Sequence, residues 1–218
     1  MYIPPAFLET RLEVMHDLIR SHPLALLITD GPGGLAASPI PFLVFPEEGA
    51  NGTLRGHMAR ANGQWQDLQG GAECLAVFQG AQGYVTPSWY PNKEATHKVV
   101  PTWNYVTVQA WGRPAVIDDA AWVRRLVVDL TGAQEQARPQ PWSPSDAPED
   151  YLAAMLQMIV GIEIPIDRIE GKWKLSQNRE EIDRLGVIKG MGAAADPHRN
   201  PPLAELVAER HDKLQSPR

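Results

Sequence analysis

Short runs of hydrophobic residues, often alternating with polar ones, dominate the first half of the chain and predict β-strands. The runs cover residues 24–29, 35–45, 53–58, 74–78, 84–86 and 102–117. A Gly-rich turn joins the first two runs, and a second Gly-containing turn predicts a hairpin from the runs 74–78 and 84–86. Further along, the alternation of Ile162, Ile164 and Ile166 predicts a strand with one buried face, in which Pro165 indicates an edge or a bulge.

Hydrophobic residues at helical spacing predict a helix near the N-terminus. Thr10 and Glu13 form a candidate capping box at its start, and the His22-Pro23 step ends it. His16 and His22 are six residues apart and cannot share a helical face as metal ligands would. We therefore expect both histidines at the surface.

Further helices follow from the same spacing. Residues 60–68 predict a short helix after the third strand. Asp118 or Asp119 is the candidate cap of a longer helix, and Ser145 is the candidate cap of another after a Pro-rich connection.

The composition changes after Met191, where residues 192–197 predict a linker and residues 201–215 a short helix. We expect one domain at residues 1–191 and an accessory extension at residues 192–218. Five to seven short strands, mostly neighbours in sequence, favour a mainly β, α+β fold with flanking helices. They predict an antiparallel barrel rather than a parallel sheet of alternating strands and helices.

Composition narrows the class of protein. Of the 218 residues, 44% are hydrophobic and 21% are charged, as in an ordinary globular protein. No apolar run approaches the roughly 20 residues that cross a bilayer, and the first residues lack a secretory leader, so we expect a cytoplasmic protein. The lone cysteine, Cys74, lies in an apolar run and is expected in the core.

The net charge of −6 argues against strong non-specific binding of DNA and leaves a local basic patch open. The sequence has no phosphate-binding loop of P-loop or Rossmann type, no nucleophile elbow and no cysteine or histidine cluster with zinc spacing. Nucleotide hydrolysis, dinucleotide binding through these loops and zinc binding are thus not indicated.

Residues 56–62, Gly-His-Met-Ala-Arg-Ala-Asn, run from a strand end into a predicted helix start. Backbone N–H groups gather at such a point, and Arg60 adds a fork of donors suited to phosphate. This segment is a candidate phosphate cradle. The alternative is an ordinary exposed helix start with a surface arginine.

Two other segments are candidates for ligand contact. Residues 87–91 and 100–105 place four aromatic side chains around a loop, which could wall a site for a planar ligand or close the core or a subunit contact. In residues 169–178, Lys172 and Lys174 share one face of an extended segment and Trp173 the other. The two lysines suit an anion, or they protect a solvated edge strand.

In this order, these segments resemble the PaiB-type family of FMN-binding negative transcriptional regulators. The resemblance is carried by residues 1–4, 56–62, 84–90, 100–105 and 171–179, and covers roughly residues 1–191. It implies a split β-barrel similar to that of pyridoxine phosphate oxidases and flavin reductases, with FMN at the interface of a homodimer.

The resemblance also implies a set of flavin contacts. The backbone of residues 38–40 would follow the edge of the ring system, His57 and Met58 would lie beside it, and Arg60 and Asn62 would hold the phosphate. Contacts from other segments, including the partner chain, complete the implied set: Ser38, Pro39, Ile40, His57, Met58, Arg60, Asn62, Thr102, Trp103 and Lys172.

Three functions stay open at this point. The family resemblance implies a regulatory flavoprotein, with DNA as a possible partner that the acidic charge does not support. The fold implied by the resemblance also hosts flavin-dependent oxidoreductases. Haem in the same groove is a third alternative, with His57 as the candidate axial ligand.

Overall fold

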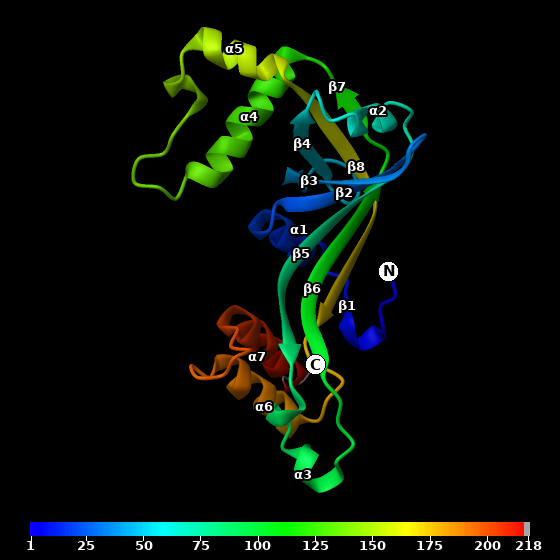
Figure 1. The fold of residues 1–218 in the computed structure, drawn as a ribbon, viewed down its shortest axis with the longest axis vertical. Helices are drawn as coiled ribbons and strands as arrows, with labels where there is room; N and C mark the ends of the chain where they lie inside the picture. The colour runs from blue at the N-terminus through cyan, green and yellow to red at the C-terminus, as the bar shows by residue number, and fades with distance from the viewer. Residues whose placement is uncertain (216–218) are drawn as a thin grey trace. The chain divides into compact units, whose positions relative to one another are not determined.

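The computed structural model describes residues 1–215, and its contacts divide the chain into two compact units (Figure 1). Unit 1 comprises Met1–Thr10, Gln79–Thr107 and the chain from Gly171 onward; unit 2 comprises Arg11–Phe78 and Val108–Glu170. Three long strands contribute residues to both units: β5 (Cys74–Val85), β6 (Thr102–Gly112) and β8 (Ile159–Lys174).

The sheet is antiparallel in every ladder of known register, which confirms the expected mainly β architecture. The strand order is β8-β4-β3-β2-β5-β6, and an additional β6–β8 pairing closes this path. The other strands are β2 (Leu24–Gly31), β3 (Gly34–Phe45), β4 (Thr53–Ala59), β7 (Ala115–Ile117) and, in unit 1, β1 (Leu8–Glu9). The β2–β3 hairpin, the third strand and the alternating isoleucines of β8 all lie where the sequence predicted them.

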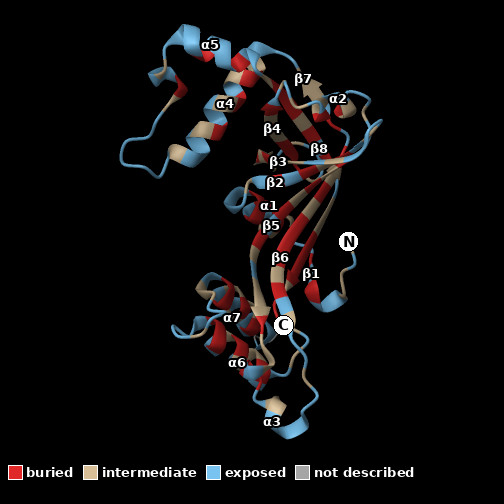
Figure 2. Cartoon of the chain, in the orientation of Figure 1, coloured by how far each residue is buried: buried red, intermediate tan, exposed pale blue. Residues whose placement is uncertain are grey.

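Alternation of buried and exposed residues along the strands places the core of unit 2 on one face of its sheet (Figure 2). In β2, Ala25, Leu27 and Thr29 point into this core, where Phe42 and Phe78 meet edge to face with their ring centroids 6.4 Å apart. Cys74, at the start of β5, is also buried and its thiol donates to the carbonyl of Gly112, so the expected core cysteine is confirmed.

Four helices flank the sheet of unit 2: α1 (Leu12–Ser21), α2 (Gln64–Leu68), α4 (Ala120–Glu135) and α5 (Glu149–Gln157). Asp119 caps α4 by accepting from the backbone N–H of Trp122 at 2.6 Å, as one of the two predicted caps. Helices α4 and α5 pack on each other through Val123, Leu152 and Leu156.

Unit 1 surrounds the ends of β5, β6 and β8 with short elements: η1 (Pro5–Phe7), η2 (Pro87–Trp89), α3 (Asn92–Thr96), α6 (Glu181–Gly192) and α7 (Pro201–Gln215). Trp89 lies against Gly186 and Gly190 of α6, and its indole N–H donates to Asp196 at 2.8 Å. The tail helix predicted at residues 201–215 is α7, which packs on α6 and buries Leu203 and Val207. The boundary drawn after Met191 stays a prediction.

The hairpin predicted within residues 74–86 is wrong, because residues 74–85 form the single strand β5. Gly83 permits close packing instead of a turn. A Cβ on Gly83 would lie 2.9 Å from Leu203, and the Asn200 side chain donates to the carbonyl of Gln82 at 2.7 Å. The run 102–117 is likewise two strands, because Arg113 and Pro114 interrupt it.

Three helix starts differ from the predictions. Helix α1 begins at Leu12 without a side-chain cap, so Thr10 forms no capping box. Helix α2 begins only at Gln64, after a turn that contains Asn62. Ser145 lies in the 3-10 turn η3 (Pro144–Asp146), and α5 starts after Pro148, whose fixed φ suits a position before a helix.

His16 is buried, contrary to the expectation for this residue, and its Nε2 lies 2.9 Å from the carbonyl oxygen of Asn51. His22 is exposed, as expected. The turn at Gly52 passes so close to the His16 ring that a Cβ there would lie 3.0 Å from Nε2. Within residues 1–215, no helix is both long and apolar enough to cross a membrane.

Candidate functional site

The strand β3 changes its hydrogen-bonding partner halfway along its length. From Gly34 to Pro41 it pairs with β2, whereas its ladder with β4 runs only from Phe42↔Gly56 to Phe45↔Thr53. The end of β4, residues 57–59, pairs with β8 on its other side. We call residues 38–41 of β3 and 57–59 of β4 the split, because no ladder pair in the described chain joins them.

The split collects the first group of predicted site residues. Ser38, Pro39 and Ile40 lie on β3, and His57 and Met58 lie on β4. Backbone groups on the facing edges of these strands lack ladder partners across the split, and Pro39 and Pro41 offer no N–H at all. Such an edge can present carbonyl and N–H groups to a ligand, as the implied ring contacts require.

Side-chain burial separates these residues into two kinds. Met58 and Ile40 are 2% and 6% exposed, so their side chains belong to the core and only their backbone can reach a ligand. Ser38, Pro39 and His57 retain exposure. The Asn62 amide bridges the far end of the split by donating to the Ser38 hydroxyl at 3.1 Å, while its carbonyl accepts from the N–H of Gln64.

His57 faces an apolar groove of about 420 Å³ in unit 2. Helix α4, the segment after it, and the edges of β2 to β4 form the walls. Among the residues that the structure describes, the Nδ1 atom of His57 is buried without a hydrogen-bond partner, and burial lowers the pKa of the ring, which favours the neutral imidazole. The groove is lined by Pro23, Leu24, Pro41, His57, Leu130, Thr131, Gln134, Glu135 and Trp142.

Arg60 is already engaged by the chain itself. Its guanidinium donates to both carboxylate oxygens of Asp118, at 2.9 Å and 2.5 Å, and to the carbonyls of Gln157 and Ile159. The hydrogen bond to Asp118 is the main cause of the raised pKa of Arg60 and the lowered pKa of Asp118. A phosphate that binds Arg60 must therefore share it with Asp118 or displace Asp118.

The remaining predicted residues, Thr102, Trp103 and Lys172, lie in unit 1. Trp103 is 52% exposed, with Tyr84 edge-on to its ring. Lys172 is 8% exposed; its ammonium group donates to the carbonyl of Tyr2 at 3.1 Å and lies 5.2 Å from the ring centroid of Tyr105. The Nζ of Lys174 is 5.9 Å from that centroid, so the two lysines share a face while Trp173 is buried, as predicted.

Sequence reasoning missed several residues of these sites. Asp118 was predicted only as a cap, although it holds Arg60. Leu130 on α4 and Trp142 in the segment after α4 line the His57 groove, which the sequence did not indicate. In unit 1, Asn104, Ser176 and Arg179 line a pocket with Lys174. The Leu-Ser-Gln-Asn sequence after Lys174 was the available signal for this pocket.

Comparison with known proteins identifies the family. A family model described as "Putative FMN-binding domain" matches residues 1–168. An uncharacterized protein of Aspergillus fumigatus is 37% identical over 87% of this chain and 90% of its own length. The protease synthase and sporulation protein PAI 2 of Bacillus subtilis is 29% identical over 98% of this chain and 99% of its own length. The similarity thus extends beyond Met191, where the sequence resemblance was expected to end.

Solved structures show the same fold at low sequence identity. The flavocytochrome Anf3 from Azotobacter vinelandii matches with a TM-score of 0.56 and 15% identity over 77% of this chain and 69% of that chain. The FAD and heme binding protein from Mycobacterium smegmatis matches with a TM-score of 0.56 and 19% identity, over 77% and 73% of the two chains. The expected split-barrel fold is confirmed, and this chain belongs to the PaiB-type family defined by the "Putative FMN-binding domain".

Proposed function

We propose that this protein is a PaiB-type flavoprotein that binds FMN at the split as a homodimer and acts as a negative transcriptional regulator. The observation that carries the flavin proposal is the combination of an interrupted β3–β4 ladder with an apolar groove that contains one unsatisfied imidazole nitrogen. The family of the chain supports the same ligand.

The groove fits a planar ring in size and chemistry. Its volume of about 420 Å³ lies within the ~300–1,000 Å³ of small-molecule sites, which are mostly apolar with a few placed polar groups. Trp142, Leu130 and Pro41 supply apolar surface, and neutral His57 can donate or accept a hydrogen bond through Nδ1. A bound flavin would supply one- or two-electron redox chemistry there.

The phosphate is expected at Arg60 and Asn62, at the end of β4. Arg60 offers a planar fork that binds two oxygens at once, and the Asn62 amide, now on Ser38, can turn to an oxyanion. The Asp118 carboxylate stands in for the anion in the intramolecular ion pair. Exchange of Asp118 for a phosphate keeps the Arg60 charge paired.

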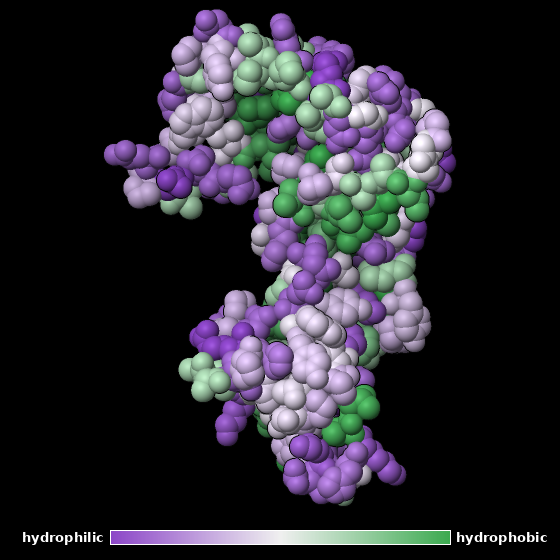
Figure 3. All heavy atoms as spheres, viewed as in Figure 1, coloured by the Kyte–Doolittle hydropathy of each residue, from purple (hydrophilic) through white to green (hydrophobic). Residues whose placement is uncertain are grey.

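A second copy of the chain is the partner that we assign to the outer face of β2. Leu24 and Leu26 are 61% and 43% exposed on this face, and Leu24 also lines the His57 groove. Figure 3 shows hydrophobic atoms gathered over this part of unit 2. Because the apolar face and the groove are continuous, a second copy that covers the face also covers the ligand. Thr102, Trp103 and Lys172 of that copy are the expected further contacts.

The regulatory role rests on the family resemblance, and the net charge of −6 favours action through a local patch or another protein. A mobility-shift assay at low salt separates these routes, because direct repression requires a shift with promoter DNA. Flavin-dependent oxidoreduction is the alternative, supported by the redox chemistry of the ligand. Anaerobic bleaching of the bound flavin by a reduced nicotinamide would support that alternative.

Haem is a second candidate ligand, favoured by the unpartnered His57 nitrogen and by two structural neighbours, a flavocytochrome and an FAD and heme binding protein. An imidazole nitrogen in an apolar site is a suitable axial ligand. The optical spectrum distinguishes the two ligands. A Soret band marks haem, whereas two broad bands, one in the near ultraviolet and one in the blue, mark oxidised flavin.

The decisive experiment combines that spectrum with titration of the purified full chain by FMN and riboflavin. We expect a flavin spectrum, a mass of two chains in solution and tighter binding of FMN than of riboflavin. Colourless monomers that fail to quench the fluorescence of added FMN would refute the proposal.

A further inference from the structure

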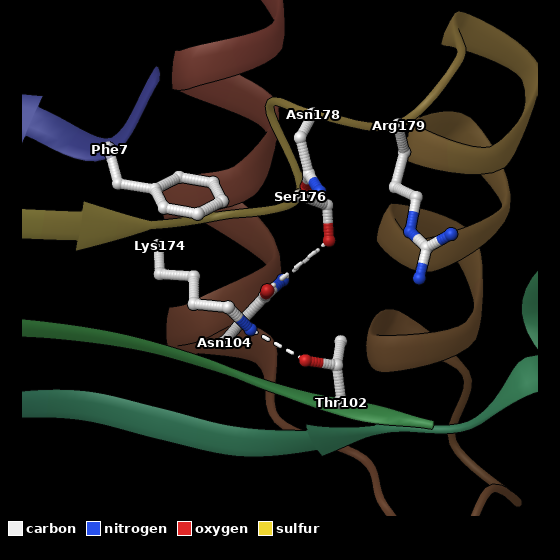
Figure 4. Close-up of a pocket in the computed structure, with 7 residues that line it drawn as sticks. All are labelled: Phe7, Thr102, Asn104, Lys174, Ser176, Asn178 and Arg179. Carbon is white, nitrogen blue, oxygen red and sulfur yellow. Dashed lines mark hydrogen bonds between the residues drawn. The ribbon is translucent and has the colours of Figure 1, made fainter. Parts of the chain in front are cut away.

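A small polar pocket lies within unit 1, between the ends of β6 and β8 and the segment that follows β8 (Figure 4). Its volume is about 80 Å³. A single water needs roughly 10–15 Å³ by this measure and whole cofactors need several hundred. The pocket therefore suits one small group rather than a ring system. It is lined by Phe7, Thr102, Asn104, Lys174, Ser176, Asn178 and Arg179.

The positive charges around this pocket lack acidic partners. Lys172, Lys174 and Arg179 form no ion pair with a carboxylate in the part of the chain that the structure describes. Two of the acidic residues that follow Arg179 are engaged elsewhere, because Glu180 and Asp183 both accept from the Asn92 amide. The cluster stands out in a chain of net charge −6.

The three cations are close enough to disfavour one another. Burial lowers the pKa of Lys174, and the positive charges of Lys172 and Arg179 lower it further. Within residues 1–215, Lys174 donates only to neutral oxygens, the Thr102 hydroxyl at 2.6 Å and the carbonyl of Trp103. Arg179 lies over the face of Tyr90, 4.8 Å from the ring centroid. A bound anion would offset this repulsion.

Neutral hydrogen-bonding groups complete the lining. The buried side chains of Asn104 and Ser176 bond to each other, at 2.9 Å and 3.2 Å. Thr102 accepts from Lys174, so its own hydroxyl proton can be donated to a ligand. Ser176 has a φ of 65°, a left-handed conformation that is unfavourable for serine and found more often at functional sites.

We propose that this pocket binds an oxyanion, the phosphate or carboxylate group of a small ligand other than the flavin. Lys174 and Arg179 supply the charge, and Thr102 and Asn178 supply neutral donors. The proposed flavin phosphate site uses other residues, Arg60 and Asn62, which belong to unit 2. The oxyanion proposal does not depend on flavin binding.

The test measures the thermal stability of the full chain in increasing inorganic phosphate or acetate, with chloride adjusted to constant ionic strength. The variants are Lys174→Met, Arg179→Met and the milder Thr102→Val, with Lys189→Met as the control because Lys189 is exposed on α6. Circular dichroism verifies that each variant is folded. If Lys174→Met or Arg179→Met unfolds, Thr102→Val provides the comparison.

We expect saturable stabilisation by one of the two anions in wild type and in Lys189→Met. Each pocket variant should lower the affinity for that anion by about tenfold, as expected for the loss of a charge-assisted or neutral contact in a small site. Stabilisation by phosphate alone would identify a phosphate-bearing ligand, and stabilisation by acetate would identify a ligand with a carboxylate. Equal responses in all variants, or no response to either anion, would overturn the proposal.

A flavin arm distinguishes this site from the proposed cofactor site. Lys174→Met and Arg179→Met should keep the preference for FMN over riboflavin, because neither residue is a proposed flavin contact, whereas the oxyanion response should survive even in protein that binds no flavin. Loss of the FMN preference in Arg179→Met but not in Arg60→Ala would assign the pocket to the flavin phosphate and refute a second ligand.

Discussion

The guanidinium of Arg60 makes two parallel hydrogen bonds to the carboxylate of Asp118, across 58 positions of sequence. The Asp118 side chain is 67% exposed, so solvent screens the pair and it contributes little to stability. The ion pair matters for ligand binding instead. Asp118 neutralises the charge of Arg60 at the end of β4, so any phosphate that binds there must compete with Asp118.

Arg60→Ala is expected to lower the affinity for FMN by about tenfold or more and to leave the affinity for riboflavin unchanged. Only FMN carries the phosphate that the guanidinium of Arg60 can hold. Asp118→Asn should raise the affinity for FMN, since it removes the competing carboxylate charge. Titration of flavin fluorescence measures both. Arg20→Ala is the matched control, because Arg20 forms an exposed ion pair with Asp17 on α1 at 2.6 Å. Equal losses for FMN and riboflavin would remove Arg60 from the phosphate site.

His57 should make the fold sensitive to acid. Burial lowers its pKa in the folded chain, so between that value and about 6.5 the unfolded chain binds a proton that the folded chain does not. Stability from this residue is therefore present above about pH 6.5 and is lost as the pH falls below it. His57→Asn should reduce the loss of unfolding free energy between pH 7.5 and 5.5, measured by denaturant titration. The exposed His97→Asn is the control, and an unchanged pH dependence in His57→Asn would contradict the expectation.

Leu26→Glu should convert the expected dimer to monomer without unfolding it, because a charge on an exposed apolar strand face is tolerated by the monomer and not by a covered interface. Light scattering after gel filtration gives the mass. Leu214→Glu, at a 50% exposed position of α7, is the control. A dimer that survives Leu26→Glu would exclude the β2 face as the interface.

Gly190 and Gly192 provide a matched pair on one helix. A Cβ on Gly190 would lie 2.4 Å from the Trp89 ring, whereas one on Gly192 meets nothing within 4 Å. Gly190→Ala should destabilise the fold by about 1–3 kcal/mol through overpacking, despite the better helix propensity of alanine. Gly192→Ala should be neutral or slightly stabilising. Thermal unfolding compares them, and equal stabilities would show that Trp89 moves aside freely.

Cys74 is expected to resist thiol reagents in the folded chain. Burial raises the pKa of its thiol to about 12, so almost none is thiolate at neutral pH. A colorimetric thiol assay should detect no reactive group in native protein and one per chain in denaturant. Rapid reaction under native conditions would mean that β5 opens locally around Cys74.

The sequence determined the elements whose signals are local. Alternation and a Gly-rich turn were sufficient for β2 and β3, the isoleucine pattern for β8, and helical spacing for α1 and α4. These depend on contacts between neighbouring residues, which periodicity encodes directly. The same local signals failed at β5, where Gly83 accommodates Leu203 and Asn200 from more than 100 residues away.

The tertiary structure alone decided which partners each polar group acquires. Three hydrogen bonds join distant segments that have no periodic signature: Arg60 with Asp118, Asn62 with Ser38, and His16 with the carbonyl of Asn51. The cluster of Lys172, Lys174 and Arg179 was half visible as two lysines on one strand face, but its missing counter-charge was not. A motif names the donors of a site, whereas the fold fixes which of them are already satisfied, because a buried donor takes the nearest acceptor that the packed chain provides.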